Sequence, residues 1–278
     1  MNKQPKISVV TVSFNCRDVI EQTICNVLHQ TYGNVEYIVI DGASTDGTKE
    51  IIDRYADRLA YYVSEPDKGI YEAMNKGILA ATGEWIIFRN AGDYFFKPTT
   101  IADVFSWYED HGEELIVGGL RSFKHDSYRD GVYTGGADVW QRALIPHAST
   151  FVRLSAHKAH LFPTEYRIAS DYHFFQQMML EGADMAIYDG IVALFDAEYG
   201  ISSRNLLQNW REMLQIRKSL GAPAEVIKET KRKCRRLRMA SLILDVLKKN
   251  RRLYAAYRRV HPKAGWTMQP IDVTLSDI

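Results

Sequence analysis

The stretch that decides the fold runs from residue 7 to residue 40 and reads ISVVTVSFNCRDVIEQTICNVLHQTYGNVEYIVI. Its first part, residues 7–14, is a β-branched run of strand length. Residues 18–30 then carry apolar side chains at helical spacing, and residues 35–40 form a second apolar run. A strand, a helix and a second buried strand in this order predict a β-α-β unit, and therefore a parallel sheet.

The alternation of strands and helices continues beyond this unit. Residues 42–48 form a turn rich in helix-capping side chains. Further strands are predicted at residues 59–64 and 85–88, with a helix between them at residues 69–81. We therefore predict an α/β fold with a Rossmann-like, mostly parallel central sheet and flanking helices.

The second half of the chain has a less regular pattern of strands and helices. From residue 205 onwards the chain reads as helices. We expect residues 1–204 to form the α/β domain and residues 205–278 to form a helical, basic extension. The elements expected in the second half are a helix at 99–108, short strands at 115–118, 121–124 and 149–152, a helix at 171–182, and short strands at 185–188 and 191–195.

The composition is that of an ordinary globular chain of 278 residues, 46% of them hydrophobic and 25% charged. The three cysteines, Cys16, Cys25 and Cys234, are too few and too irregularly spaced for a disulfide framework or a zinc cluster. No segment reaches the roughly 18 apolar residues of a membrane span, and the first residues lack the long apolar region of a signal peptide. We therefore expect a cytoplasmic protein that is neither secreted nor integral to a membrane.

The net charge of +1 hides an asymmetry along the chain. Residues 225–263 contain fourteen Lys or Arg against three Asp or Glu, so this tail carries a charge of +11 and the remainder −10. A basic run at 231–238 precedes an apolar run at 239–244, and further cations follow at 248–252. This layout is typical of a helix that lies on an anionic lipid surface. We expect peripheral binding to the inner face of the cell membrane rather than to nucleic acid, and a merely solvated helix is the alternative.

Polar side chains stand where the predicted strands end. The first strand ends at Ser13, Phe14 and Asn15, the second at Asp41, the third near Asp67 and Lys68, and the fourth at residues 90–93. In an open parallel sheet the ligand binds beyond the carboxyl ends of the strands, so these side chains suit a nucleotide diphosphate. The glycine-rich fingerprint of dinucleotide-binding enzymes and the P-loop motif are both missing, which argues against a dehydrogenase and a P-loop NTPase.

Four blocks carry a resemblance to a known family. Residues 11–15 (TVSFN), 40–48 (IDGASTDGT), 67–77 (DKGIYEAMNKG) and 81–86 (ATGEWI) look, in order and spacing, like the blocks of family 2 glycosyltransferases with the GT-A fold. The resemblance is strong for residues 7–93, fair as far as residues 195–202 and weak beyond. It implies that Phe14 stacks on a pyrimidine base and that Asp41 accepts the base N–H, which prefers uracil, although guanine stays open. The residues that we expect to bind the nucleotide sugar are Val12, Ser13, Phe14, Asn15, Asp41, Asp67, Lys68, Asn75, Asn90, Ala91, Gly92 and His147.

Asp93 matches the last carboxylate of the family's Asp-x-Asp type motif and is expected to hold Mg²⁺ or Mn²⁺ on the two phosphates. The sequence departs from the family here, since Asn90 and Gly92 stand where many relatives have Asp. One carboxylate makes a weak metal site, so phosphate oxygens and water must supply the remaining ligands.

Asp171 matches the position of the family's catalytic base. A helix N-cap is the alternative interpretation. His147 resembles a family histidine near the diphosphate, as a metal ligand or a phosphate donor, and a structural histidine is the alternative.

The resemblance implies metal-dependent, inverting transfer of a sugar from a UDP-sugar to a saccharide acceptor, which we expect to be lipid-linked, in cell-surface polysaccharide biosynthesis such as capsule, O-antigen or exopolysaccharide. Two alternatives remain at this point. One is a polyprenyl-phosphate glycosyltransferase of the same fold, and the other is a non-catalytic nucleotide-binding scaffold.

Overall fold

The computed structural model describes residues 4–124, 127–131, 133, 139–140, 144–196 and 205–248. Its first four strands are β1 (Ile7–Ser13), β2 (Val35–Asp41), β3 (Tyr61–Ser64) and β4 (Trp85–Phe88). They lie in the order β3-β2-β1-β4, and all three pairings are parallel. The predicted parallel sheet of the first half is therefore confirmed.

The second half makes the sheet mixed. Its strands are β5 (Asp93–Phe95), β6 (Leu115–Lys124), β7 (Ser127–Gly131), β8 (Thr150–Arg153) and β9 (Met185–Asp196). Strand β8 pairs with β4 and β6 in antiparallel fashion, β7 pairs antiparallel with β6, β6 and β9 run parallel, and β5 pairs antiparallel with β9 at the sheet edge.

Two pairs of predicted short strands are single long strands. Residues 115–124 form β6 without a break, and residues 185–196 form β9. The register between them shifts on either side of Gly119, which accounts for the interrupted apolar pattern in the sequence. Asp93 also begins a strand of its own, β5, rather than ending the fourth strand.

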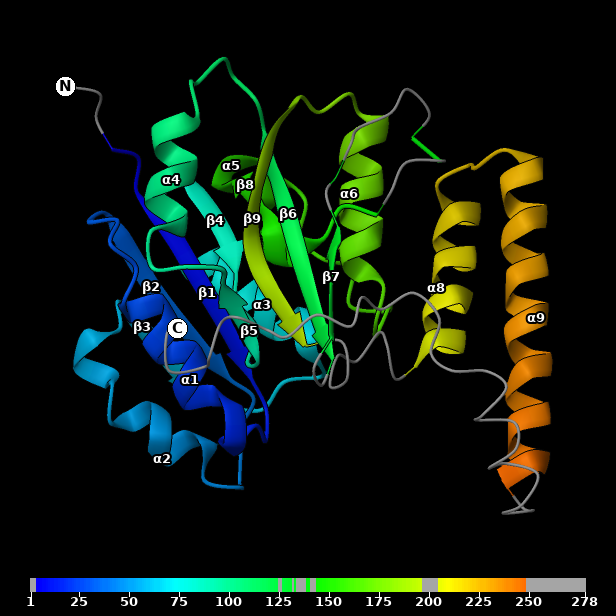
Figure 1. Ribbon diagram of the computed structural model, residues 1–278, viewed down its shortest axis with the longest axis horizontal. Helices are drawn as coiled ribbons and strands as arrows, with labels where there is room; N and C mark the ends of the chain where they lie inside the picture. Colours follow the sequence, from blue (N-terminus) through cyan, green and yellow to red (C-terminus); the bar gives the residue numbers. More distant parts are fainter. Residues whose placement is uncertain are drawn as a thin grey trace.

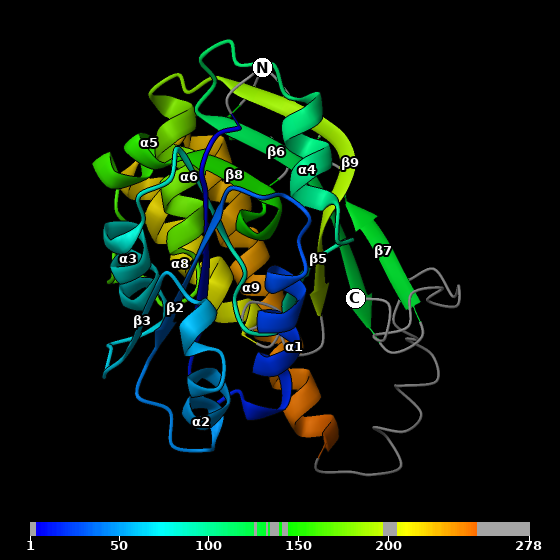
Figure 2. The same cartoon turned by 90° about the vertical axis from the view of Figure 1, so that its left-hand side faces the viewer.

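Helices cover both faces of the sheet, as Figures 1 and 2 show. On one face Val10 and Val12 pack with α3 (Ile70–Ala80) and α6 (Ser170–Leu180), and on the other Ile7 and Val9 pack with α1 (Arg17–Leu28) and α4 (Thr100–Trp107). This alternation along β1 is the strand period of two, which explains why a strand buried on both faces is apolar throughout. The helices are α1 (Arg17–Leu28), α2 (Thr48–Asp53), α3 (Ile70–Ala80), α4 (Thr100–Trp107), α5 (Leu154–Ala159), α6 (Ser170–Leu180), α8 (Leu206–Ser219) and α9 (Ala224–Lys248), with short 3₁₀ turns η1 (Ala56–Arg58) and η2 (His147–Ser149).

The C-terminal helices α8 and α9 pack against each other beside α6 (Figure 1). Met213 and Ile216 of α8 form a small apolar cluster with Ala169, next to the start of α6. The buried carboxylate of Glu212 accepts hydrogen bonds from the backbone N–H groups of Ile168 and Ala169, at 2.8 and 3.0 Å. Helix α8 therefore holds the beginning of α6 in place. No helix within the described part of the chain has the length and apolar character to cross a membrane.

Candidate active site

The ends of β1, β2 and β3 bring together Phe14, Asp41 and Asp67. Ser13 lies opposite Asp41 and Asp41 lies opposite Ser64 in the parallel register, so the three loops leave the sheet side by side. They meet at Gly42, where an added Cβ would lie 2.5 Å from Asp67 Oδ2 and 3.2 Å from Phe14 Cδ2. The Phe14 ring is 64% exposed, which leaves its face available for stacking.

Asp41 is buried, and protein groups already hydrogen-bond its carboxylate. Oδ1 accepts from the hydroxyls of Ser13 and Ser44, and Oδ2 accepts from the Ser44 N–H and the Ser64 hydroxyl. A nucleobase N–H must therefore replace one of these donors. The serine hydroxyls can rotate away from the carboxylate. The contact between Asp41 and the base stays a prediction, and it requires one of these hydroxyls to rotate.

The predicted residues of β1 and its loop have specific structural contacts. Val12 is buried in the sheet, and its carbonyl oxygen accepts the Ala91 N–H at 3.2 Å. Asn15 has a φ of +47° and its side-chain oxygen accepts the Thr45 N–H. These contacts join the loops after β1, β2 and β4 at one edge of the sheet.

Residues 90–93 form a tight turn at this edge. The Asp93 N–H donates to Asn90 O at 2.8 Å, and Gly92 has a φ of +95°, a conformation that glycine tolerates. Asn90 Oδ1 is buried and has no hydrogen-bond partner within the described ranges. A buried oxygen of this kind, beside a carboxylate of the same turn, suits a hard divalent cation. No group of three or more His, Cys, Asp or Glu that could hold a metal occurs among the described residues, so the phosphates must complete any metal site here.

Arg89 lies directly before this turn and was not predicted from the sequence. It is fully buried, it stacks 3.7 Å over the Phe95 ring centroid, and its Nη1 donates to the carbonyl oxygens of Phe88 and Ala148. Its Nε and Nη2 have no hydrogen-bond partner in the part of the chain that is described. Burial lowers the pKa of Arg89, and the charge of Asp93 opposes that effect. The guanidinium therefore places a buried positive charge next to the Asp93 turn.

A hydrogen-bonded chain connects this turn to Asp171. Asn90 Nδ2 lies 3.2 Å from His147 Nε2, and His147 Nδ1 lies 2.9 Å from Asp171 Oδ2. The other carboxylate oxygen, Asp171 Oδ1, accepts from the Tyr172 N–H at 2.8 Å and lies 3.0 Å from the Tyr71 hydroxyl. The Tyr71 proton is shared with the carbonyl oxygen of Ile168, at 2.7 Å. The carboxylate is thus oriented from two sides and is still 23% exposed, as a general base requires.

The protonation of His147 depends on this chain. Burial would lower the pKa of His147, but its hydrogen bond to Asp171 and the charges of Asp171 and Asp93 outweigh that effect and raise it. Neutral imidazole accepts from the Asn90 amide nitrogen, whereas imidazolium needs an acceptor there and matches Asn90 Oδ1 after the amide turns over. The orientation of the Asn90 amide is therefore coupled to the protonation of His147 in the His147–Asp171 pair.

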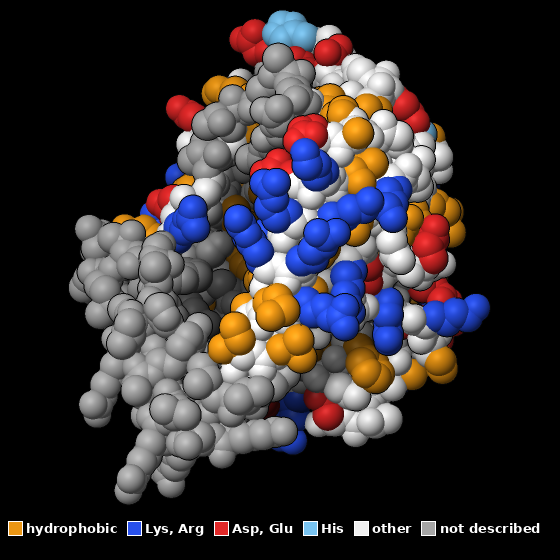
Figure 3. Space-filling view, turned by 90° about the vertical axis from the view of Figure 1, so that its right-hand side faces the viewer, with side chains coloured by type: hydrophobic (Ala, Val, Ile, Leu, Met, Phe, Trp, Pro, Cys, Tyr) orange, Lys and Arg blue, Asp and Glu red, His pale blue; other side chains and the backbone are white. Residues whose placement is uncertain are grey.

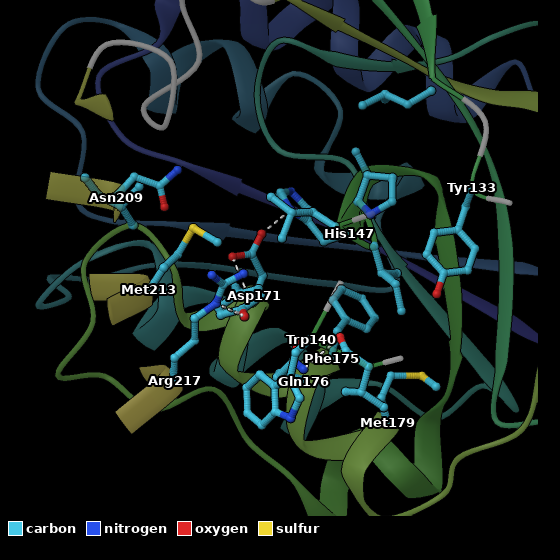
Figure 4. A pocket seen from close by; sticks show the side chains of 18 of the residues that line it. Tyr133, Trp140, His147, Asp171, Phe175, Gln176, Met179, Asn209, Met213 and Arg217 are labelled. Atoms are coloured by element: carbon cyan, nitrogen blue, oxygen red, sulfur yellow. Dashed lines mark hydrogen bonds and ion pairs between the residues drawn. The ribbon is translucent and has the colours of Figure 1, made fainter. Parts of the chain in front are cut away.

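Asp171 and His147 line a pocket of about 220 Å³ between η2, α6 and α8 (Figure 4). Its other walls are mostly apolar, and Phe14, Asp41, Asn90 and Asp93 are not among them. The strand-end residues therefore do not form its described walls, whereas Asp171 and His147 do. Its further lining residues include Trp140, Leu144, Ile145, Phe175, Gln176, Met179, Asn209, Met213 and Arg217.

Two predicted residues lie apart from this arrangement. The Asn75 amide is used by the backbone of Phe162, since Nδ2 donates to Phe162 O and Oδ1 accepts the Phe162 N–H, both at 2.9 Å. Both polar atoms of the Asn75 amide therefore have structural partners, and its predicted nucleotide contact stays a prediction. Lys68 is exposed, and it lines a different hollow with Glu72 and Tyr166.

The sequence reasoning missed Tyr71, Glu212 and Arg217 as well as Arg89. Tyr71 belongs to the quoted block 67–77, where no role was assigned to it, and it is 7% exposed. Glu212 and Arg217 belong to the extension, where the resemblance is weak. Only the packing of α8 on α6 shows that Glu212 holds the start of α6 and that Arg217 lines the pocket.

Comparison with solved structures identifies the class of fold. Staphylococcus aureus TarS 1-349, solved in complex with UDP-GlcNAc, matches with a TM-score of 0.65 and 18% identity over 81% of this chain and 71% of that chain. The mannosyltransferase PcManGT from Pyrobaculum calidifontis, in complex with GDP-Man and Mn²⁺, matches with a TM-score of 0.63 and 18% identity over 95% of this chain and 77% of that one. The chain spans 39% of a longer TarS structure. The predicted GT-A fold with C-terminal helices is confirmed.

The sequence comparisons then identify the family. Residues 8–197 match glycosyl transferase family 2, so the chain belongs to this family and is a glycosyltransferase. An uncharacterized glycosyltransferase of Mycobacterium tuberculosis is 32% identical over 180 residues, which cover 63% of this chain and 69% of that protein. A PGL/p-HBAD biosynthesis glycosyltransferase of Mycobacterium bovis is 28% identical over 216 residues, which cover 73% and 81%.

Proposed function

We propose that this chain transfers a sugar with inversion from a UDP-sugar to the hydroxyl of a saccharide acceptor, in a reaction that depends on a divalent metal. The observation that carries this proposal is the position of Asp171. Its carboxylate is oriented by His147 and Tyr71, is linked through His147 to Asn90 of the strand-end turn, and lines a separate pocket. A base in that place can serve an acceptor that lies across from the donor.

The proposed reaction is a single displacement. Asp171 removes the proton of the acceptor hydroxyl, and the hydroxyl oxygen forms a bond to the anomeric carbon. The bond from that carbon to the diphosphate oxygen breaks, and its electron pair leaves with the nucleoside diphosphate. Attack from the face opposite the leaving group inverts the configuration. His147 and Tyr71 hold the carboxylate toward the acceptor, so orienting the carboxylate adds less to the activation free energy.

A divalent metal would be held by Asp93 and by the Asn90 amide oxygen of the same turn, together with the phosphates. When bound, Mg²⁺ or Mn²⁺ neutralises charge on the departing diphosphate. TarS has been solved with UDP-GlcNAc and PcManGT with GDP-Man and Mn²⁺, which supports a nucleotide-sugar donor and leaves the choice of UDP or GDP to experiment.

The expected acceptor is a lipid-linked saccharide of cell-surface polysaccharide or glycolipid synthesis. In support, one relative is a PGL/p-HBAD biosynthesis glycosyltransferase, and another is a putative teichuronic acid biosynthesis glycosyltransferase of Bacillus subtilis, 36% identical over 99 residues. We also propose that the protein works at the cytoplasmic face of the membrane, bound through the basic residues from 225 onwards. Residues 249–263 of that tail lie outside the described ranges.

The first test is Asp171→Asn, assayed after a screen of nucleotide sugars for thermal stabilisation and slow hydrolysis. Loss of a general base should lower kcat by about 10²- to 10⁴-fold, while the affinity for UDP stays within twofold of the wild type. Near-normal turnover would instead favour transfer to polyprenyl phosphate, because that acceptor is already an anion.

A second test separates the enzyme from a non-catalytic scaffold. Titration with UDP in the presence and absence of Mn²⁺ should show tighter binding with the metal, and Asp93→Asn should remove that gain. If Mn²⁺ makes no difference to the wild-type affinity, the metal-dependent mechanism is wrong and the scaffold is favoured.

A further inference from the structure

The pocket beside Asp171 combines apolar walls with the guanidinium of Arg217. Leu144, Ile145, Phe175, Met179 and Met213 provide much of its apolar surface, and Arg217 reaches it from α8 (Figure 4). The strand-end residues of the donor side do not contribute to it. Among the described residues, a ligand of this pocket therefore meets the Arg217 guanidinium near the His147–Asp171 pair, in an otherwise largely apolar surrounding.

Among the described residues, neutral groups hold the Arg217 side chain. Its Nε donates to the Tyr172 hydroxyl at 2.8 Å, and its Nη1 donates to Thr230 Oγ1 of α9 at 2.5 Å. Across the ranges that the structure describes, no carboxylate lies within ion-pair distance of Arg217, and its Nη2 makes no hydrogen bond. By contrast, Arg54, Arg121 and Arg153 each form an ion pair with a carboxylate.

This arrangement keeps a positive charge oriented and available. The two neutral acceptors fix the plane of the guanidinium, and the side chain is half-buried, so the charge is only partly solvated. An anionic group in the pocket would compensate for the water that the guanidinium has lost. The planar guanidinium suits the two oxygens of a phosphate or a carboxylate. A ligand that is only apolar or only neutral would leave the charge without a partner.

We propose that Arg217 recognises an acidic group, a phosphate or a carboxylate, on the acceptor, while the apolar walls contact an apolar part of the same molecule. The acceptor is then an amphiphilic anion. This inference rests on the proposed function, in which the pocket beside Asp171 receives the acceptor. It also gives the C-terminal extension a direct part in acceptor choice, because Arg217 lies in α8 and is fixed by Thr230 of α9.

The test measures the binding of matched probes by titration calorimetry with saturating UDP and Mn²⁺ present, so that the donor side is filled. Farnesyl phosphate is compared with farnesol, and octyl glucuronide with octyl glucoside. We expect at least one of the anionic probes to bind about tenfold or more tightly than its neutral partner. The pair that shows this preference distinguishes a phosphate from a carboxylate.

Arg217→Gln should reduce that preference to within about twofold, and Arg217→Lys should retain part of it, because the charge remains while the two-pronged geometry is lost. The matched control is Lys218→Gln, which removes the exposed cation next along α8 and should leave the preference intact. Thermal unfolding of each variant in the same buffer checks that α8 and α9 still pack against each other. If Arg217→Gln does not fold, the wild type is compared with Arg217→Lys instead.

Three results would overturn the inference. They are equal affinity of the wild type for anionic and neutral probes, a preference that persists in folded Arg217→Gln, and a loss of UDP affinity in Arg217→Gln, which would place the guanidinium on the donor instead. Failure of the wild type to bind UDP at all is a different result, because it contradicts the proposed function before the acceptor probes are added.

Discussion

At the scale of single residues, the site depends on how one carboxylate is held. Asp171 is contacted from η2 by His147 and from α3 by Tyr71, two residues far from it in the sequence. Both partners orient the carboxylate and neither is itself a carboxylate. Their effect on the reaction should therefore appear in turnover more than in donor binding.

Tyr71→Phe tests the hydroxyl that orients Asp171. We expect a loss in kcat of about tenfold with KM for the donor unchanged, because the variant removes one hydrogen bond to the base and none to the nucleotide. The same change should lower the free energy of unfolding by about 0.5–1.5 kcal/mol, the usual net value of a hydrogen bond. Tyr166→Phe is the matched control and should leave kcat unchanged. An unaltered kcat in Tyr71→Phe would show that the hydroxyl serves stability alone.

His147→Asn tests the pH dependence of the pair. The folded-state pKa of His147 is raised, so the imidazolium stabilises the fold most strongly below the ordinary histidine pKa, and this contribution fades as the pH rises through the raised value. Urea unfolding of wild type and variant between pH 5 and pH 9 should give a difference in unfolding free energy that shrinks as the pH increases. A difference that grows with pH would contradict the assigned direction.

At the scale of elements, α9 has one face on which cations are followed by apolar side chains. Lys228, Lys231, Arg232 and Arg235 share a pocket wall on this face. Met239, Leu242 and Ile243 continue it at spacings of three and four residues, and each is more than half exposed. Figure 3 shows Lys and Arg side chains gathered on the side of the molecule that carries α8 and α9, with a hydrophobic patch next to them.

Replacing Lys228, Lys231, Arg232 and Arg235 together by Gln should weaken co-sedimentation with vesicles that contain anionic lipid by at least about tenfold, since each cation near such a surface contributes about 1 kcal/mol. Replacing Met239, Leu242 and Ile243 by Ser should weaken it further, because the apolar side chains can enter the headgroup boundary. The control changes Lys49, Arg54, Arg58 and Lys97 to Gln, which removes the same charge from the body of the protein. Equal loss in the control would mean that net charge, and not this face, drives binding.

At the scale of the whole molecule, the boundary predicted at residue 204 separates parts that share one site. Glu212 caps the start of α6, and Asn209, Met213 and Arg217 form a wall of the pocket. We expect a chain that ends at residue 204 to unfold at a clearly lower urea concentration than one that ends at residue 223, because only the longer chain retains α8. Equal unfolding midpoints for the two chains would show that α8 is a dispensable appendage.

The sequence by itself determined the α/β class, the four parallel strands and the family, because strand and helix periods and the order of the blocks are local properties of residues 7–93. It also placed Phe14, Asp41 and Asp93 at one edge of a sheet, since parallel strands all end on the same side. Only the tertiary structure decided that β6 and β9 are unbroken and that the Asn75 amide bonds the backbone of Phe162. It also decided that Tyr71 contacts Asp171, that Glu212 holds the start of α6 and that Arg217 lines the pocket beside Asp171. These are contacts between segments far apart in the chain, and no local pattern of side chains encodes which partner each of them meets.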